Sequence, residues 1–289
     1  MRTLLFFLLI IAIPLEESTA NVNVDNQEIT LEKVEIQQYG LQTIDRAFID
    51  AQKLESLMDN LEDAIYRKPE NAHFNQFGQI VAEKPGAKLD RKQFQHLFRN
   101  LYYSEKEGKL KVPETPVYPK VDTGLLKEIS TNMLGSYVTF YKQSNAERSH
   151  NIGLAAEAIN NTVIFPGETF SFNEVVGERT GDRGYKRAPV IVRGELSEDI
   201  GGGICQVSST LYNAVDLKGV KIVERYAHSR RVPYVPPGRD ATVSWWGPDF
   251  VFKNLYNEPL LIRAQSVNGS MVVTIYSSET VEYFNGNQD

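Results

Sequence analysis

Apolar and polar positions alternate between residues 29 and 40, and this period of two predicts a strand. Over residues 43–66 the apolar side chains instead recur every three or four positions, which predicts an amphipathic helix. Thr43 or Asp45 is placed to cap its first turn, because a short polar side chain there accepts a hydrogen bond from an unpaired main-chain amide. The chain is therefore expected to begin its fold with a strand and a long helix.

A second strand and helix follow, and they end at a run of prolines. The segment QIVAEK (79–84) has the composition of a strand, and Asp90 precedes the helical pattern of residues 91–104. Prolines recur between residues 113 and 119 and favour extended backbone, since proline lacks the amide donor that a helix needs. We therefore expect a small N-terminal α+β domain over residues 22–120, ending in this proline-marked linker.

Helical spacing returns in the second half of the chain. It is clear in residues 147–162 and in residues 206–217, where Gly219 is placed to end the helix. It is weaker in residues 123–138. Cys205 therefore stands at the start of a predicted helix.

Strand patterns dominate the rest of the second half, and Gly, Pro and Asn residues separate them. They predict a larger α+β domain over residues 121–275, with a mostly antiparallel sheet and a helix that begins at Cys205. A C-terminal tail is expected at 276–289. The segments with strand character are 163–177, with a tight turn inside it, 184–196, 220–228, 241–247, 250–255, 259–267 and 270–278.

Residues 1–20 have the three-part pattern of a secretory signal peptide. Arg2 supplies a positive start, a long apolar run follows, and Ala20 ends a group of small residues. An uncleaved signal anchor is the alternative, because acidic Glu16 and Glu17 follow the apolar run. A membrane helix needs about 20 apolar residues, and no other apolar run of the sequence approaches that length. We therefore expect a secreted protein with no stable membrane span after cleavage.

The charge and cysteine content exclude several classes of protein. The formal net charge is −6, whereas nucleic-acid binding usually needs a basic face. The sequence has 1 cysteine, so the mature protein cannot form an internal disulfide and must be stabilised by its core. His73, His96 and His150 show no metal-ligand spacing. We expect no nucleic-acid partner, no metal and no cofactor.

Three glycines stand just before Cys205 at its predicted helix start, with Ile204 between them and the cysteine. The unpaired amides and the positive end of the helix dipole favour a thiolate at this place, and the same amides can hold an oxyanion. Gly201, Gly202 and Gly203 permit unusual backbone angles and close approach by a ligand. Cys205 is therefore a candidate nucleophile. The alternative is a small apolar side chain that only fills the core.

A thiol nucleophile needs a base, and His228 is the candidate. His228 ends a strand pattern, and Asp240 follows at a distance that allows it to orient the imidazole. The chain order of Cys205, His228 and Asp240 resembles that of transglutaminase-like and papain-like thiol enzymes. Alternatively, His228 is a polar surface or ligand-binding group, and Asp240 is a turn residue after Gly238-Arg239.

Arginines accompany this constellation in the sequence. Arg179 and Arg183 lie in a glycine-punctuated loop, and Arg231 comes later in the chain. Guanidinium groups recognise carboxylates through paired hydrogen bonds. With Gly201–Gly203 and with Gln206 beside the thiol, these arginines form the predicted ligand-binding set for a carboxylate-bearing ligand. Each arginine taken singly is alternatively a solvated loop charge.

Aromatic residues offer a second kind of ligand surface. Trp245 and Trp246, with Tyr226 and Tyr234, form a candidate platform for a sugar or a peptide. Neighbouring residues of a strand point to opposite faces, so we expect one tryptophan at most to join the platform and the other to lie in the core.

Five motifs occur in order between residues 125 and 264: FPGETFSFNEVVGERTGDRGY, GGGICQVSSTLYNA, ERYAHSRRVPY, PGRDATVSW and DFVFKN. Together they resemble the VanW family. The preceding segment, with NAHFNQFGQIVAEKPGAKLD and LKVPETPVYP, is similar to the peptidoglycan-binding domain that precedes the VanW region in some bacterial envelope proteins.

The resemblance implies an exported, cell-wall-associated bacterial protein whose partner is peptidoglycan or its stem peptides, but it implies no reaction. From the residues, the sharper hypothesis is thiol-dependent acyl transfer or hydrolysis of stem peptides, of a transpeptidase, amidase or peptidase kind. Cys205 would attack, His228 would move the proton, and Asp240 would orient His228. The alternatives are a non-catalytic module that binds peptidoglycan or a carboxylate, and a structural envelope protein.

Overall fold

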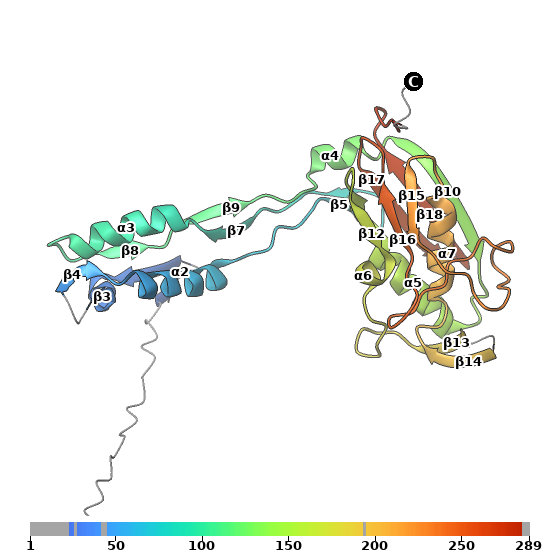
Figure 1. Ribbon diagram of the computed structural model, residues 1–289, viewed down its shortest axis with the longest axis horizontal. Helices are drawn as coiled ribbons and strands as arrows, with labels where there is room; N and C mark the ends of the chain where they lie inside the picture. Colours follow the sequence, from blue (N-terminus) through green and yellow to red (C-terminus); the bar gives the residue numbers. More distant parts are fainter. Residues whose placement is uncertain (1–22, 26–27, 42–44, 193–194, 285–289) are drawn as a thin grey trace, which may run out of the picture. The chain divides into compact units, whose positions relative to one another are not determined.

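The computed structural model describes residues 23–25, 28–41, 45–192 and 195–284 (Figure 1). The signal peptide predicted for residues 1–20 and the last residues of the predicted tail lie outside the described residues. Within the described residues, no helix is both long and apolar enough to cross a membrane. The chain forms two compact units, unit 1 with the residues up to Glu70 and Pro85–Pro119, and unit 2 with Asn71–Lys84 and the residues from Lys120 onward.

Unit 1 combines short antiparallel sheets with two long helices. β1, β2 and β8 form one sheet, β3 pairs with β4, and β7 pairs with β9. Its elements are β1 (Asn23–Asp25), β2 (Glu28–Glu32), α1 (Lys33–Ile36), the 3-10 helix η1 (Gln37–Tyr39), β3 (Gly40–Leu41), β4 (Asp45–Ile49), α2 (Ala51–Ile65), β7 (Gly86–Leu89), α3 (Arg91–Tyr103), β8 (Lys109–Lys111) and β9 (Glu114–Val117).

Helix α2 starts later than its apolar pattern predicts. Thr43 lies outside the described residues, and Asp45 belongs to β4, which pairs with β3. Asp50 is the cap, because its carboxylate accepts hydrogen bonds from the main-chain amides of Gln52 and Lys53 at 3.0 and 3.2 Å. Strand pairing therefore replaces the first turns of the predicted helix.

Helix α3 follows Asp90 as predicted, and this carboxylate accepts a hydrogen bond from the Gln93 amide at 2.9 Å. Its fully buried Phe94 and Phe98 pack with the buried face of α2, which includes Leu61. This core gives unit 1 an apolar centre of its own.

Unit 2 holds the larger core and the sequence motifs. Its elements are β5 (His73–Phe74), β6 (Ile80–Val81), α4 (Thr123–Glu128), β10 (Asn132–Phe140), α5 (Ala146–Ile159), β11 (Val163–Ile164), β12 (Thr169–Ser171), α6 (Phe172–Val176), β13 (Arg187–Val192), β14 (Glu195–Ile200), α7 (Ile204–Ala214), β15 (Val220–Glu224), β16 (Val251–Asn254), β17 (Leu260–Val267) and β18 (Ser270–Ser277).

Antiparallel sheets build unit 2. One has the order β10-β18-β17-β11 and another the order β12-β16-β15, while β13 and β14 form a separate hairpin. Helices α5 and α7 contact each other and the larger sheet (Figure 1). Along β18 burial alternates, so that Met271, Val273 and Ile275 enter the core. The α+β class and the mostly antiparallel sheet are confirmed.

Several predicted elements of unit 2 differ in the structure. The weakly helical segment 123–138 is a helix only in α4 and then enters β10. The predicted strand 241–247 is not a strand, and Thr242 makes only an isolated bridge with Tyr226. Strand β15 ends at Glu224, so His228 lies in the loop that follows. The irregular backbone around these residues is where the candidate site forms.

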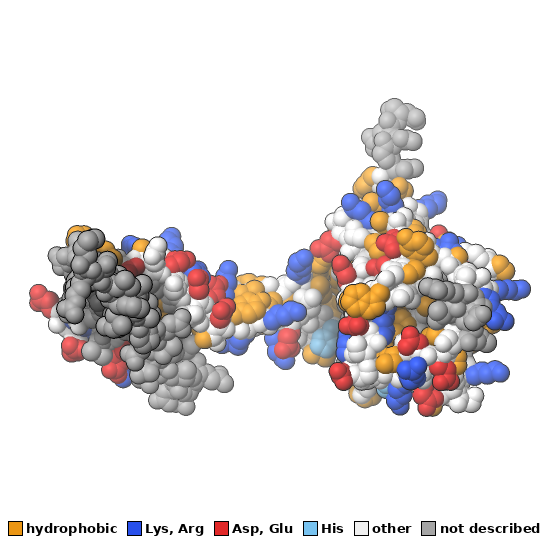
Figure 2. Space-filling model, turned by 60° about the horizontal axis from the view of Figure 1, so that its bottom comes forward, with side chains coloured by type: hydrophobic (Ala, Val, Ile, Leu, Met, Phe, Trp, Pro, Cys, Tyr) orange, Lys and Arg blue, Asp and Glu red, His pale blue; other side chains and the backbone are white. Residues whose placement is uncertain are grey.

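The hairpin β5–β6 joins unit 2, although residues 71–84 precede the proline-marked linker. The main-chain amide and carbonyl of Phe74 bond the Asn161 side chain at 3.1 and 2.9 Å, and the Arg263 guanidinium lies 4.1 Å from the centre of the Phe74 ring. On the face that Figure 2 shows, acidic and basic side chains of the described residues are interspersed. The wall-binding function expected of the first domain stays a prediction.

Candidate active site

Cys205 lies in the first turn of α7, behind a glycine loop that other elements hold tightly. Asn151 on α5 donates from its amide to the carbonyls of Lys186 and Gly202 at 2.8 and 3.0 Å. Gly203 has φ +111°, which a side chain would strain. A Cβ on Gly202 would lie 2.5 Å from the Ala188 carbonyl oxygen. Gly202 and Gly203 thus have structural reasons that are independent of any ligand.

One polar face of α7 holds the segment that carries Asp240. Ser208 donates to the Ala241 carbonyl at 2.6 Å, and Ser209 accepts from the Ala241 amide at 2.9 Å. Asn213 donates to the Arg239 carbonyl at 2.8 Å. These side chains stand three, four and eight residues after Cys205, which places them on its face of the helix. The helix therefore positions both the thiol and the acid.

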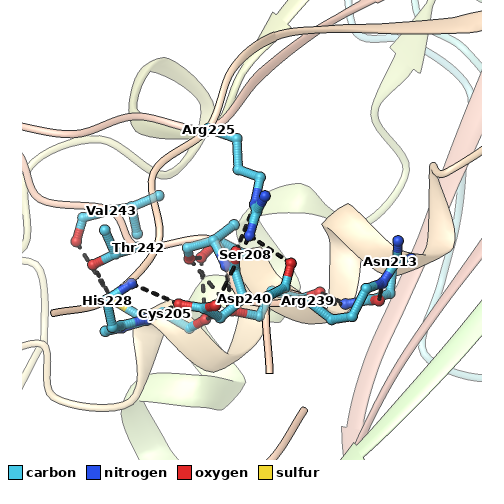
Figure 3. A network of polar contacts seen from close by, with 12 residues as sticks. Cys205, Ser208, Asn213, Arg225, His228, Arg239, Asp240, Thr242 and Val243 are labelled. Atoms are coloured by element: carbon cyan, nitrogen blue, oxygen red, sulfur yellow. Dashed lines mark hydrogen bonds and ion pairs between the residues drawn. The ribbon is translucent and has the colours of Figure 1, made fainter. Parts of the chain in front are cut away.

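Cys205, His228 and Asp240, the three candidate residues from the sequence, lie together in the structure (Figure 3). Oδ2 of Asp240 accepts from Nδ1 of His228 at 2.7 Å and from the His228 main-chain amide at 2.6 Å. This leaves Nε2 for the thiol, with which His228 shares a hydrogen bond. Sγ of Cys205 also lies 3.5 Å from the carbonyl oxygen of Val243 and 3.8 Å from Oγ1 of Thr242.

The protonation equilibria of the three groups are coupled. Burial opposes ionisation of Cys205, but the hydrogen bond and positive charge of His228 outweigh it, so the pKa of the thiol lies below its ordinary value. Burial also opposes charge on His228, but Cys205 and Asp240 raise the pKa of the imidazole above its usual range. The net shifts favour a thiolate–imidazolium pair.

Asp240 stays ionised beside this pair. Its side chain is only 10% exposed, and this burial opposes charge, yet the hydrogen bonds from His228 hold the pKa of the carboxyl below its usual range. Arg225 adds a cation, with Nη2 3.9 Å from Oδ1 of Asp240, and Nε donates to the Asp240 carbonyl at 2.7 Å. Asp240 is thus placed to fix the orientation and tautomer of the imidazole.

A cleft of about 1100 Å³ opens beside the thiol. Cys205 and His228 line it, and so do Gly201, Gly203 and Arg179 from the predicted ligand-binding set. Gly202 packs against β13 instead, as its close approach to the Ala188 carbonyl shows. The candidate nucleophile is therefore accessible to a ligand of substantial size.

The other predicted ligand residues lie differently. Gln206 touches the cleft, but its buried amide already bonds Arg148, Thr139 and the Phe140 carbonyl at 2.9, 3.0 and 3.1 Å. Arg183 and Arg231 are exposed and are not among the residues that line this cleft. Their ligand-binding function stays a prediction that this cleft does not support.

The aromatic surface differs from the expectation. Because residues 241–247 do not form a strand, Trp245 and Trp246 both line the cleft, with ring centres 6.1 Å apart. The expectation of one core tryptophan is therefore wrong, and Trp246 is 87% exposed. Tyr234 also lines the cleft, and burial raises the pKa of its phenol, which keeps the hydroxyl neutral.

Other residues of the cleft are not among the site residues predicted from the sequence. Arg148 on α5 contributes a half-buried guanidinium, and Thr242 and Val243 contact the thiol directly. The nearest signal for Arg148 in the sequence is the polar run ERSH (147–150), which contains it and opens the predicted helix 147–162. Within the described residues, no group of acidic, His and Cys side chains has the arrangement of a metal site.

Comparison with known proteins locates the chain among relatives. A family model described as VanW like protein matches residues 147–276. The Bacillus subtilis (strain 168) protein YoaR, described as uncharacterized, is 51% identical over 265 residues, which cover 92% of this chain and 88% of YoaR. The vancomycin B-type resistance protein VanW of Enterococcus faecalis (strain ATCC 700802 / V583) is 34% identical over 109 residues, which cover 36% of this chain and 40% of that protein. No solved structure matches the chain.

Proposed function

Since the chain belongs to the VanW family, we propose that it is a cell-envelope protein that performs thiol-dependent acyl transfer or hydrolysis. The observation that carries this proposal is the hydrogen-bonded array of Cys205, His228 and Asp240 at the wall of a cleft. A nucleophile, its base and an orienting acid are the minimum set for this chemistry. A purely packing cysteine does not need a base that is itself held by a buried carboxylate.

In the first half-reaction, the Cys205 thiolate attacks the carbonyl carbon of an amide, and the carbonyl electron pair moves to oxygen. When the carbonyl re-forms, the C–N bond breaks. His228 donates the Nε2 proton to the leaving nitrogen, and an acyl thioester stays on the enzyme. The imidazolium that Asp240 stabilises is thus the general acid.

In the second half-reaction, water or an acceptor amine attacks the thioester while neutral His228 takes up its proton. The C–S bond then breaks and the thiolate–imidazolium pair returns. Water gives hydrolysis and an amine gives transpeptidation, so the occupant of the cleft decides the outcome.

The oxyanion of the tetrahedral intermediate would be held by a main-chain amide at the start of α7. The amides of Ile204 and Gln206 already bond the carbonyls of Gly201 and Gly203 at 3.3 and 3.0 Å. We assign the oxyanion to the amide of Cys205, which lies between them in the first turn. From the sequence, all the unpaired amides of the first turn were candidates to hold the oxyanion, whereas this proposal names one of them.

The proposed substrate is a peptidoglycan stem peptide, and the proposed location is extracytoplasmic and wall-associated. Family membership and the pattern of residues 1–20 support both proposals. The cleft volume of about 1100 Å³ leaves room for a peptide segment. Unit 1 would then hold the protein on the wall.

Iodoacetamide labelling across pH tests the activated thiol. Cys205 is the only cysteine of the sequence, so the label reports one site. We expect a labelling midpoint below the free-thiol value of about 8.5, and a rise toward that value in His228→Gln. His150→Gln is the matched control, because that exposed ring bonds the Gly184 carbonyl outside the cleft. A wild-type midpoint at or above about 8.5 would rule out activation.

Muropeptide analysis tests the reaction itself. Purified protein is incubated with peptidoglycan fragments, and new or lost amide bonds are detected by mass spectrometry. We expect changes with the wild type and none with Cys205→Ser. Identical products with and without wild-type protein would reject the enzyme and leave a binding module.

A further inference from the structure

Arg179 has a buried hydrogen-bond donor for which the described residues supply no acceptor. Nη2 donates to Oδ1 of Asn173 at 2.7 Å, and the guanidinium lies over the Phe172 ring at 5.8 Å. Within the described residues, Nη1 of Arg179 is buried and has no hydrogen-bond partner. Buried donors are almost always paired, so an unpaired one on a cation is available to a partner from outside the fold.

The surroundings hold this guanidinium in place. Asn173 is itself buried, and its amide donates to the carbonyls of Ser244 and Pro248 at 3.0 and 3.2 Å. Burial lowers the pKa of Arg179, while the negative charge of Cys205 acts in the opposite direction. Arg179 lines the same cleft as Cys205, and its contacts with Asn173 and Phe172 hold the guanidinium in place.

The rest of the cleft favours an anion. Arg148 is a second guanidinium in the lining, and burial lowers its pKa also, against the effects of Tyr234 and Cys205. The acidic lining residues are Glu178 and Asp199, both exposed. Lys142 lines the cleft too and is exposed. The two guanidiniums are thus more buried than these other charges, and buried charges act more strongly on a ligand than exposed ones.

We propose that Arg179 is a specificity-determining residue, which binds a carboxylate of the substrate through Nη1 beside the bond that Cys205 attacks. The inference rests on the proposed function, and it names the substrate class as acyl donors with a free carboxylate near the scissile amide. A carboxylate supplies the missing acceptor and offsets the buried charge, and a planar guanidinium suits its geometry.

Binding measurements test this without turnover. In a Cys205→Ala background, calorimetry compares a disaccharide-tetrapeptide muropeptide that has free carboxylates with the same muropeptide after conversion of its carboxylates to carboxamides. We expect the free-carboxylate form to bind about tenfold more tightly or better, as charge-assisted hydrogen bonds contribute on this scale. Adding Arg179→Gln removes the preference by weakening only that form.

Two further variants separate recognition from damage to the fold. Arg183→Gln is the matched control, because this exposed arginine of the same loop bonds the Glu178 carbonyl and does not line the cleft. Arg179→Lys keeps the charge but loses the planar pair of donors, so we expect an intermediate preference. Thermal unfolding of each variant shows whether the Asn173 contact is needed for stability.

The outcomes distinguish this inference from the proposed function. Equal binding of the two muropeptides by the Cys205→Ala protein, or no binding of either, overturns the inference, as does a preference that persists in folded Arg179→Gln. A preference that needs Arg179 in a protein whose wild type makes no product supports the inference and rejects the enzyme. Equal weakening of both forms would show a merely structural contribution.

Discussion

At the scale of single residues, Asp240 holds His228 in place and also affects its pKa. One of its oxygens accepts two hydrogen bonds from His228, and its main chain is bonded by Arg225. Its negative charge is one of the causes that raise the pKa of His228. In the proposed reaction, the carboxylate would therefore act on Cys205 through the imidazole, as a positioning residue.

Asp240→Asn narrows the pH range in which the ion pair exists. Without the carboxylate charge, the pKa of His228 falls toward its ordinary value. The pH above which His228 loses its proton, and the thiolate–imidazolium pair is lost, therefore moves down. With less positive charge on His228, the thiolate is less stabilised and the pKa of Cys205 rises. The pH above which the thiolate–imidazolium pair forms therefore moves up. Imidazole NMR titration and iodoacetamide labelling measure the two limits, and we expect the Cys205 midpoint to rise by about 1 unit.

Asp216→Asn is the control for this change. Asp216 pairs with Arg239 at 2.7 Å, its side chain is 54% exposed, and it does not line the cleft. Both titrations should match the wild type. Asp240→Asn titrations that also match the wild type would contradict the orienting function.

The sequence predicted the three central residues but not their full surroundings. Cys205, His228 and Asp240 are chemically distinctive, and their local context restricts what they can do. Arg148 and Thr242 are ordinary in their own segments and become site residues only because α5 and α7 pack together and the 239–243 segment bonds α7. Contacts between distant segments leave no local pattern for sequence reasoning to find.

At the scale of elements, the start of α7 depends on β13. Gly202→Ala would place a methyl group 2.5 Å from the Ala188 carbonyl oxygen and 2.8 Å from that of Pro189, so the loop or the hairpin must shift. We expect a loss of about 1–3 kcal/mol in the free energy of unfolding, measured by denaturant titration. The displaced helix start should also raise the labelling midpoint of Cys205.

Gly153→Ala is the matched control at this scale. Gly153 lies inside α5, and an added Cβ there would meet no atom within 4 Å. Alanine is the better helix former by about 0.8–1.0 kcal/mol, so this variant should be as stable as the wild type or more so. A Gly202→Ala protein with unchanged stability and labelling would show that the loop adapts freely.

Periodicity predicted helices better than it predicted strands and boundaries. The cap at Asp90 and the helices α3, α5 and α7 have strong local signals, whereas β4 takes residues with helical spacing because β3 offers a pairing partner. The segment 241–247 has strand composition, but serine side chains of α7 bond its first residue in place of a neighbouring strand. In both cases a tertiary contact overrides the local preference.

At the scale of the whole molecule, the chain enters unit 2 twice. The hairpin β5–β6 is its first segment. The chain then returns to unit 1 over Pro85–Pro119, and the rest of unit 2 follows from Lys120. Gly86 pairs with Val117 where β7 and β9 adjoin the ends of this segment. A short linker between Lys84 and Lys120 can therefore replace Pro85–Pro119 without stretching the chain.

This topology predicts that unit 2 is more stable with residues 71–84 than without them. A chain of 71–84, a short glycine–serine linker and 120–284 keeps the Phe74 contacts with Asn161 and Arg263. It also keeps Ala72 buried, with its amide bonded to the Val121 carbonyl at 2.9 Å. A chain that begins at residue 121 loses these contacts, and we expect it to be less stable by roughly 2–4 kcal/mol in denaturant titration.

Cysteine labelling completes the comparison, because it reports on the site rather than on overall stability. Both shortened chains retain every residue that lines the cleft, so the longer one should label Cys205 with the wild-type midpoint. If unit 1 anchors the protein to the wall, this chain should also lose sedimentation with insoluble peptidoglycan while it keeps that midpoint. Equal stability of the two chains would show that the hairpin is dispensable, and a shifted midpoint in the longer chain would show that the site depends on unit 1.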